Sequence, residues 1–554
     1  MLEKTARRRI DILLLSTISL LFVLCTAPPS FAHVLYGSLT GNVTDSSGAA
    51  LPGARVEALN VATGVARQVT TDNKGVYLFP ELLPGTTYKV TVSATGFDTM
   101  VTENVRVDAN TERRVDAKLA VARQRQTIEV TAAPPALQTD RADMHTDAET
   151  TQLTNIPITS SAGRSFQALY RIIPGFGIAT ELNSGAGNPQ RSMTANVNGG
   201  SSQDNATRID GSLDTYIWLP GNVAYVPPAD SVAEINVVTN SYDAEQGMTS
   251  GSAAINVVTK SGTNQFHGEA YEFNDNNAIR ARNFFNPVGY HKPKDIFNQF
   301  GGNFGGPIKR NKLFFFGDFE RTTRRQFAAR YESIPNPAAI FDSAGDADFS
   351  EVIPAGTDCN TTPTAGCIYD PNTGAATGTG RSAFPNNTIP ANRIDPAAAK
   401  MLSLIDTSGY IISGLSTASG GQIANNYYGS HPARFNRNNI DTKINYIPSQ
   451  RSTLFGRYSI SQATFLDTMM LGPAGGDSTG GGQPGTAPSR IQASGLGGTY
   501  SISPNMLIDA NVGYTRQRLG AQGTDLAEGQ FGVNTLHIPG TNGPDPMQGG
   551  IPAF

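Results

Sequence analysis

The sequence predicts a mainly β protein in three parts: a small N-terminal β-sandwich, a small mixed α/β domain, and the first strands, about seven, of a transmembrane antiparallel β-barrel. Three observations predict this fold. Charged residues make up only 16% of the 554 residues, against roughly 25% in average soluble domains, and 58 glycines mark many turns. Short runs in which apolar and polar residues alternate recur along the chain, which is typical of strands with two unlike faces. After residue 264 short and long connections alternate, as they do in outer-membrane barrels.

Residues 1–32 have the pattern of a cleaved secretory signal peptide. Three arginines at 7–9 precede an apolar run at 12–24, and the small-residue cleavage pattern ends at Ala32. The alternative is a retained membrane anchor, but the apolar run is shorter than the roughly 20 residues that a helical span needs. No later stretch of the sequence is apolar enough for such a span. We therefore expect an exported protein.

Residues 36–121 predict a β-sandwich, because short alternating runs are separated by turns such as Asp45-Ser-Ser-Gly48 and Asp72-Asn-Lys-Gly75. Expected strands include Val101–Val107 and Arg114–Leu119. The motifs GNVTDSSGAALPGA (41–54), TDNKGVY (71–77) and LPGTTY (83–88) resemble those of the carboxypeptidase regulatory-like domain, a prealbumin-like fold. The resemblance implies a non-catalytic spacer or interaction module, and its likeness to carbohydrate-binding sandwiches leaves sugar binding open.

Residues 122–139 form a predicted linker that contains a β-prone hexamer, Gln126–Thr131, followed by Pro134-Pro135. The hexamer could be the last edge strand of the sandwich. It also resembles the TonB box that outer-membrane receptors offer to a periplasmic TonB-like energy-coupling protein, with Ile128, Glu129, Val130 and Thr131 as the partner-binding residues. An extended segment of this kind binds by adding a strand to a sheet edge of its partner.

Residues 140–262 predict the mixed α/β domain. Ser161 could cap a helix that places Phe166, Leu169, Tyr170 and Ile173 on one face. The runs INVVT at 235–239 and 255–259 read as buried strands. The pieces LTNIP (153–157), LYRIIPG (169–175), VNGG (197–200), RIDG (208–211) and AAINVVTKSGTNQFHG (253–268) resemble the plug domain of TonB-dependent receptors of the Oar-like type. The resemblance implies that Asp210 and Gly211 form the usual plug turn, in which a ligand role for Asp210 is the less favoured alternative.

Residues 264–554 predict a partial barrel. Between 439 and 446 the even positions are Ile440, Thr442, Ile444 and Tyr446, and the odd positions are polar or charged. The same parity recurs in 453–460 and 506–515, with Phe455 and Leu507 as exceptions. Short connections at 307–312, 447–452 and 503–505 alternate with long ones at 275–296, 322–436 and 461–490. We expect the charged parity to face a lumen and loop 322–436 to carry ligand recognition.

The two cysteines outside the signal, Cys359 and Cys367, are expected to form a local disulfide in an exported chain, with free thiols as the alternative. The six histidines are scattered, and no metal-ligand or nucleophile motif occurs, so we predict no metal, no cofactor and no enzyme. A formal net charge of -4 gives no reason to expect nucleic acid.

The first functional hypothesis is a TonB-dependent receptor or transporter of the outer membrane. It would contact outer-membrane lipid and take up an unknown extracellular ligand, carbohydrate or peptide, by energy-coupled plug rearrangement. The alternative is a non-transporting surface adhesion or carbohydrate-binding protein. Because seven strands cannot close a barrel, we also expect the chain to be C-terminally truncated and to form a curved, open sheet beside the plug.

Overall fold

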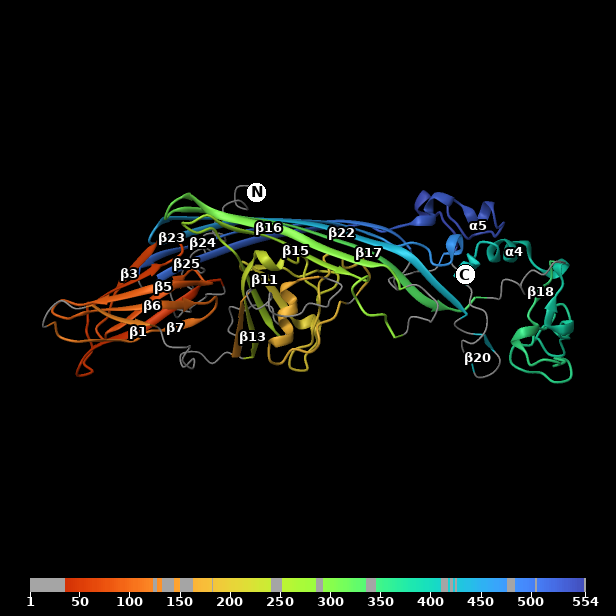
Figure 1. Cartoon of the computed structure of the whole chain (residues 1–554), viewed down its shortest axis with the longest axis horizontal. Helices are drawn as coiled ribbons and strands as arrows, with labels where there is room; N and C mark the ends of the chain where they lie inside the picture. Colours follow the sequence, from red (N-terminus) through yellow and green to blue (C-terminus); the bar gives the residue numbers. More distant parts are fainter. Residues whose placement is uncertain are drawn as a thin grey trace, which may run out of the picture.

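The computed structural model describes residues 35–122, 127–131, 144–149, 163–181, 183–240, 252–284, 292–334, 345–409, 417–418, 422–423, 426–475, 484–503 and 506–552. The predicted signal peptide and the plug motif at 153–157 lie outside these residues. The strands of one large sheet run along the longest axis of the molecule (Figure 1). The sandwich lies at one end of this sheet, the domain predicted to be a plug (called the plug domain below) beneath its middle, and the long connections at the other end.

The N-terminal part is a sandwich of two sheets. One sheet has the order β4-β1-β7, with β8 also paired to β1, and the other has the order β3-β2-β5-β6-β9. Alternate residues of the strands point inward and form one apolar core, which includes Leu39, Val56, Phe79 and Val90. The strand expected at 114–119 is divided into β7 and β8, both parallel to β1. The bounds are β1 Gly37–Asp45, β2 Arg55–Asn60, β3 Ala66–Thr70, β4 Val76–Leu82, β5 Thr86–Ser93, β6 Thr99–Val107, β7 Glu112–Arg114, β8 Ala117–Leu119 and β9 Thr127–Thr131.

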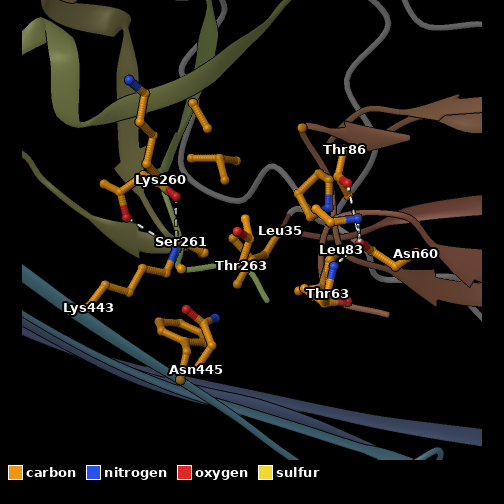
Figure 2. Close-up of a pocket in the computed structure, with 18 of the residues that line it drawn as sticks. Leu35, Asn60, Thr63, Leu83, Thr86, Lys260, Ser261, Thr263, Lys443 and Asn445 are labelled. Atoms are coloured by element: carbon orange, nitrogen blue, oxygen red, sulfur yellow. Dashed lines mark hydrogen bonds between the residues drawn. The ribbon is translucent and has the colours of Figure 1, made fainter. Parts of the chain in front are cut away.

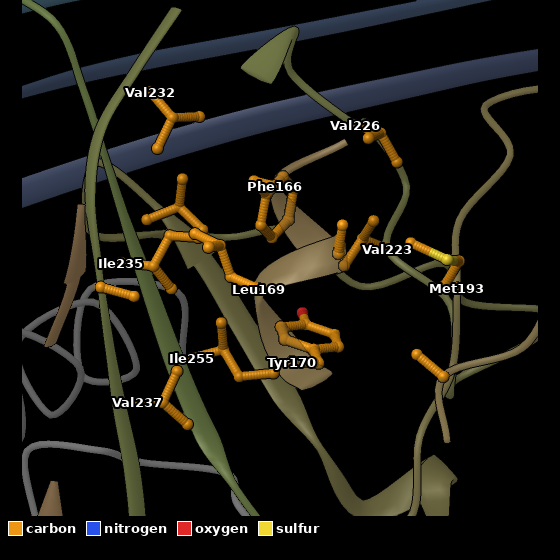
Figure 3. Close-up of a cluster of buried hydrophobic side chains, with 14 of the residues drawn as sticks. Phe166, Leu169, Tyr170, Met193, Val223, Val226, Val232, Ile235, Val237 and Ile255 are labelled. Carbon is orange, nitrogen blue, oxygen red and sulfur yellow. The ribbon is translucent and has the colours of Figure 1, made fainter. Parts of the chain in front are cut away.

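The plug domain is built on a mixed sheet of order β10-β13-β14-β11-β12. The two INVVT runs form β13 and β14, which pair antiparallel and are buried almost throughout. Side chains from this sheet and from the segments that cross it form one core (Figure 3). The bounds are β10 Met144–Glu149, β11 Ala206–Ile209, β12 Ser212–Leu213, β13 Val232–Asn240 and β14 Ala254–Thr259, with 3-10 helices η2 Ser202–Asp204 and η3 Ala229–Ser231.

The helix of the plug domain differs from the prediction in its type and its cap. It is the 3-10 helix η1, Phe166–Ile172, and its cap is Ser165, whose hydroxyl accepts a hydrogen bond from the Gln167 amide. The predicted cap Ser161 lies outside the described residues. A turn of Pro174 and Gly175 so close behind leaves no room for a longer α-helix. The predicted apolar face is nevertheless buried, with Phe166 and Leu169 fully enclosed.

The third part is an antiparallel sheet whose seven long strands pair in chain order, β15-β16-β17-β22-β23-β24-β25. The seven strands agree with the predicted number. In the described residues β15 and β25 are the two open edges of this sheet, so the sheet is the expected partial one. The bounds are β15 His267–Asn276, β16 Asp295–Lys309, β17 Leu313–Glu332, β22 Tyr427–Ser449, β23 Ser452–Leu466, β24 Gly485–Ser503 and β25 Met506–Leu519; β26, Gln522–Gly523, adds a short pairing to β24.

The strands are longer than predicted at the end that carries the long connections. Residues 322–332 continue β17 and residues 427–436 belong to β22, so the predicted loop 322–436 shrinks to 333–426. The physical reason is that regular apolar alternation is broken in these extensions, where polar residues such as Arg324 and Arg325 mix with aromatic residues such as Phe327 and Tyr428. Short elements decorate the connections: β18 Ala347–Asp348, η5 Ser350–Val352, η6 Pro385–Asn387, β19 Thr388–Ile389, η7 Ala391–Arg393, α4 Pro396–Leu402, η8 Thr407–Gly409, β20 Thr417–Ala418, β21 Gln422–Ile423, η9 Gly472–Ala474, η10 Thr524–Glu528, α5 Phe531–Asn534 and η11 Pro546–Gln548.

The large sheet has the polarity of a membrane barrel. On β22, Ile440 and Ile444 are 45% and 49% exposed, whereas Asp441 and Lys443 on the other face are 4% and 6% exposed. The same inversion holds on β23, where Tyr458 is exposed and Arg457 is buried. A soluble sheet would bury its apolar face instead. The predicted parity is therefore confirmed, with the charged face turned toward the plug domain.

The parity has two irregularities, and the structure explains the first. Phe455 points inward because it packs in a small apolar cluster with Leu35, Tyr36 and Val258, where the sandwich and plug domain meet the sheet. The sequence of the first strand, β15, does not alternate cleanly between apolar and polar residues. The strand pairs with β16 without a register shift, so a bulge is not the cause. Its residues are exposed on both faces. In the described part of the chain, no helix is both long and apolar enough to cross a bilayer.

Substitution of Ile444 by Lys should separate a lipid-facing surface from an aqueous one. On the outer face of a barrel the ammonium should cost about 2–4 kcal/mol of folding free energy near the bilayer midplane. Val121→Lys, on an exposed position of the sandwich, is the matched control and should change stability by less than about 0.5 kcal/mol. Urea titration of protein folded into lipid vesicles measures both. Equal effects of the two substitutions would contradict a lipid-facing sheet.

Candidate functional site: the contact layer between the plug domain and the sheet

The inner face of the large sheet is a layer of buried polar side chains that reach the plug domain. Strand alternation brings every second residue of β16, β17, β22 and β23 to this face. The layer includes carboxylates, amides, one lysine and two arginines, which are rarely buried unless they are paired. Its members are Gln299, Asn303, Asp318, Glu320, Arg437, Asn439, Asp441, Lys443, Asn445, Arg457 and Ser459.

Asp210 and Gly211 form the two-residue turn between β11 and β12, with φ of 46° and 77°. Positive φ at both positions is typical of a type I′ hairpin and favours Asp and Gly there. A Cβ at Gly211 would also displace the side-chain amide nitrogen of Asn511 on β25. The same Asn511 amide donates a hydrogen bond to the Asp210 carbonyl oxygen, at 2.8 Å. The turn is therefore held against the wall of the sheet.

The Asp210 carboxylate joins the plug domain to two cations of the sheet. It accepts hydrogen bonds from Lys443 Nζ at 2.9 Å and from the amide and hydroxyl of Thr259 at 3.0 Å and 2.6 Å. Arg457 Nε lies 3.2 Å from its other oxygen as an ion pair. Burial alone would raise the pKa of Asp210, but the charges of Lys443 and Arg457 hold that pKa below its ordinary value.

A second contact joins Tyr225 of the plug domain to Asp441 of β22. The phenol donates a hydrogen bond to the carboxylate at 2.7 Å, and Ser459 of β23 donates to the other oxygen. Burial, with the nearby Asp441 charge, raises the pKa of Tyr225 well above its ordinary value, so the phenol remains a donor. Its backbone amide donates to Asp214, whose pKa burial raises to about 7.

A third contact lies nearer the end of the sheet that carries the long connections. Gln299 of β16 makes two hydrogen bonds to the backbone of Arg164, accepting from its amide at 2.8 Å and donating to its carbonyl at 3.1 Å. Arg437 of β22 donates to the Gln190 carbonyl of the plug domain at 2.7 Å and lies 3.5 Å from Glu320. The three contacts together attach the plug domain along much of the length of the sheet by polar groups. Apolar contacts add to them where Ile491 and Ala493 of β24 join the plug core and Phe455 of β23 packs near Val258.

The predicted partner-binding segment lies in β9, at one edge of the sandwich. Its residues pair in parallel with β6, with Ile128 opposite Met100 and Val130 opposite Thr102. Within the described residues no strand pairs with the other edge of β9. The segment therefore is the last edge strand of the sandwich, one of the two alternatives that the sequence allowed, and its outer edge faces no other described strand.

The sandwich, the plug domain and the sheet meet around a cavity of about 190 Å³. Lys443 and Asn445 of β22 and Ser261 of the plug domain line one part of it, and Thr63 of the sandwich lines another (Figure 2). The three parts also contact each other directly. Arg67 of the sandwich donates to the Thr453 hydroxyl of β23 at 2.8 Å. The Ala109 amide donates to Glu234 of the plug domain at 2.6 Å, and burial raises the pKa of Glu234. The sandwich thus covers the short-turn end of the inner face.

At the other end, the plug loop 184–186 and the ends of β23 and β24 border a cavity of about 240 Å³. The long connection beyond it folds into a lobe at residues 345–409, in which a disulfide joins Cys359 and Cys367. The described residues contain no group of three or more His, Cys, Asp or Glu side chains arranged to hold a metal ion.

Sequence reasoning identified the turn at Asp210 but not its partners on the sheet. The useful signal was present, because Lys443 and Arg457 stand on the inward parity of strands whose other parity is apolar. Which of these charges meets the plug domain depends on strand register and on how the domain sits. Neither follows from local pattern.

Comparison with known proteins supports this architecture. A family described as "Outer membrane beta barrel domain" matches residues 258–554, and the carboxypeptidase regulatory-like domain matches residues 38–120. The chain is 27% identical over 261 residues to the TonB-dependent transporter Oar of Myxococcus xanthus, a match that covers 45% of this chain and 23% of that protein.

Solved structures give weaker similarities. The ferric enterobactin receptor of Pseudomonas aeruginosa, a mutant in complex with enterobactin, is 12% identical with a TM-score of 0.36, and covers 69% of this chain and 42% of that one. A ferric enterobactin receptor in complex with BCV-L6 gives 13% identity, a TM-score of 0.37 and the same coverages. The chain thus spans less than half the length of each of these relatives.

Replacement of Asp210 by Asn should weaken the attachment of the plug domain by about 3–5 kcal/mol, because it leaves two buried cations without their counter-charge. Hydrogen exchange of the β11–β12 amides measures the effect. Asp204→Asn, at a half-exposed carboxylate on η2, is the control and should leave exchange unchanged. Because the folded pKa of Asp210 is depressed, its contribution is present above about pH 3.9 and is lost as the pH falls through the folded value. Unaltered exchange in Asp210→Asn would contradict this role.

Mass spectrometry of non-reduced peptides should recover Cys359 and Cys367 linked to each other. A bridge across eight residues should contribute about 2–3 kcal/mol to the lobe. The double substitution Cys359→Ser with Cys367→Ser should therefore speed proteolysis within residues 345–409 and leave the sandwich intact. Two alkylated thiols in exported protein would rule the bridge out.

Proposed function

Since the chain belongs to the outer membrane β-barrel domain family, we propose that it acts as a TonB-dependent transporter that takes up an extracellular ligand by energy-coupled movement of its plug domain. The observation that carries the proposal is the polar contact layer: a plug domain attached by ion pairs and hydrogen bonds to the inner face of a sheet whose outer face is apolar. Polar contacts of this kind can be exchanged for contacts with water, so a plug domain held by them can move.

The chain is an outer-membrane protein. The exposed apolar parity of the sheet faces lipid hydrocarbon, and the backbone polar groups of neighbouring strands pair with each other, except along the two open edges at β15 and β25. Short turns mark the periplasmic end and long connections the external end. The sandwich therefore lies on the periplasmic side, and the disulfide-bonded lobe at 345–409 lies outside.

The proposed coupling partner is a periplasmic TonB-like protein, and the proposed contact is Ile128–Thr131. As the edge strand β9, this segment can offer its outer edge to a partner strand, or it can leave β6 and be bound on both sides. The parallel pairing with β6 over only five residues makes departure inexpensive relative to the unfolding of the sandwich. Pro134 and Pro135 follow and limit any continuation of the strand.

The proposed ligand enters at the external end, past the lobe and toward the cavity beside plug loop 184–186. Its chemistry is a carbohydrate or a peptide in this proposal, and no catalytic residue is assigned. The second candidate, a surface adhesion or carbohydrate-binding protein, is favoured by the separately folded lobe with its own disulfide. A transporter loses uptake but keeps surface binding in cells without the coupling protein, whereas an adhesin is unaffected.

Substitution of Val130 by Pro should abolish binding of the coupling protein, because it removes a backbone donor and fixes φ within the segment. Pull-down of the purified chain with the periplasmic domain of the TonB-like protein measures this without knowledge of the ligand. Val130→Ala keeps the backbone amide and should bind within about threefold of the wild type. A far-ultraviolet melting curve checks that the sandwich remains folded. Undiminished capture of the Val130→Pro protein would remove the coupling assignment.

A further inference from the structure

Two pairs of like charges face each other across neighbouring strands on the inner face of the sheet. Asp318 of β17 is directly opposite Asp441 of β22, and Lys443 of β22 is directly opposite Arg457 of β23. Directly opposed like charges destabilise a sheet. The two pairs lie in adjacent rows, since Asp441 and Lys443 are two residues apart on one face of the same strand, roughly 7 Å.

The plug domain treats the two pairs differently. It inserts Asp210 between Lys443 and Arg457, which neutralises the positive pair. It offers only the neutral phenol of Tyr225 to the negative pair, and that phenol contacts Asp441 alone. Asp318 is 4% exposed, and neither of its carboxylate oxygens has a hydrogen-bond partner among the described residues.

Other charged groups near this cluster already have partners of their own. Glu320 lies beside Arg437 at 3.5 Å. Asp230 of the plug domain holds Arg164 at 2.7 Å, and Lys260 lies 3.3 Å from Glu269. Among the described residues, these pairs leave Asp318 with neither an ion pair nor a hydrogen bond, whereas Asp441, also without an ion pair, accepts two hydrogen bonds. With the plug domain in place, the cluster therefore has three carboxyl groups, those of Asp210, Asp318 and Asp441, beside two cations.

Withdrawal of the β11–β12 hairpin would remove Asp210 and leave two carboxylates against two cations on the wall. Hydrogen bonds already connect the positive pair to the negative pair. Arg457 donates to the Ser459 hydroxyl at 2.9 Å, and Ser459 donates to Asp441. A modest change of side-chain rotamers would let Lys443 and Arg457 pair with Asp441 and Asp318. Long cationic side chains have that reach.

We propose that Asp318 is a positioning residue for plug movement: it completes a charge-balanced wall that accepts Lys443 and Arg457 when Asp210 withdraws. The inference rests on the proposed function, in which the plug domain moves. Without Asp318, withdrawal would leave a buried cation unpaired, which strongly disfavours the withdrawn state. In the attached state Asp318 contributes no stabilising contact.

The test uses a plug position that is buried until the hairpin leaves. Ser212→Cys, on β12, is introduced in the full-length chain in cells, and its rate of labelling by a membrane-impermeant maleimide is measured with and without the TonB-like protein. The disulfide-bonded Cys359 and Cys367 do not react. Asp318→Asn should lower the coupling-dependent labelling rate at least tenfold. Asp318→Glu keeps a carboxyl group, so its labelling rate should remain within about threefold of the wild-type rate. Asp295→Asn, which removes a carboxylate from the wall near its outer end, should leave the rate unchanged.

The stability of the attached state gives a second readout that a merely structural role would move in the opposite direction. Asp318→Asn should leave the melting temperature unchanged or raise it, because it neutralises a buried carboxylate without a partner. A lower melting temperature, a labelling rate equal to that of the wild type, or an equal slowing by Asp295→Asn would each overturn the inference. If the unsubstituted Asp318 protein labels at the same rate without the coupling protein, the proposed function itself fails.

Discussion

The large sheet carries its charged side chains on the face that packs against the plug domain, and its aliphatic and aromatic side chains on the opposite face. The surroundings of both faces follow from this arrangement. The apolar face needs hydrocarbon around it, because water would leave half-exposed side chains such as Ile444 and Val512 unburied. The charged face needs partners, because buried ions without counter-charges are expensive. The plug domain supplies those partners, alongside the apolar contacts that it makes with Phe455, Ile491 and Ala493 of the sheet.

A polar attachment has a consequence for motion. An apolar interface of the same size would be held by burial alone, and its separation would expose hydrocarbon to water. The contacts at Asp210, Tyr225 and Arg164 instead exchange protein partners for water or for each other, at a net value of only about 0.5–3 kcal/mol apiece. A plug domain held in this way is firmly placed and yet removable by a modest pull. The like-charged rows of the sheet have the same property in the proposed movement, because Lys443 and Arg457 can then pair with Asp318 and Asp441 of the sheet itself.

The sequence was sufficient to predict the three-part fold, the number of long strands and the inward parity, because each depends on local alternation and on the lengths of connections. The sequence did not predict the features that local pattern leaves open, namely the strand ends, the helix cap and the partners of Asp210. The strand ends at 322–332 and 427–436 mix polar and aromatic residues without a regular alternation, so they were predicted as loop. The cap moved from Ser161 to Ser165, since local capping chemistry allows both serines. The partners of Asp210 are 233 and 247 residues away in sequence, and only register and docking bring Lys443 and Arg457 to it.

The segment that connects the sandwich to the plug domain begins and ends in edge strands, and this arrangement links coupling to motion. β9 is the outermost strand of one sandwich sheet, and β10 is the outermost strand of the plug sheet, paired only to β13 among the described strands. An edge strand has one neighbour to leave, whereas a central strand has two. Under the proposed function, a pull on Ile128–Thr131 would first act on β9 and then, through the covalent chain, on β10. Each strand could separate from its single neighbour while β13 and β14 keep the plug core closed.

The Asp210 hairpin lies at the opposite edge of the same plug sheet, beyond β14, so a pull at β10 reaches it only through the core as a whole. Release of the hairpin then depends on how easily the wall gives up Asp210, which places the control of plug movement in the charges of β17, β22 and β23.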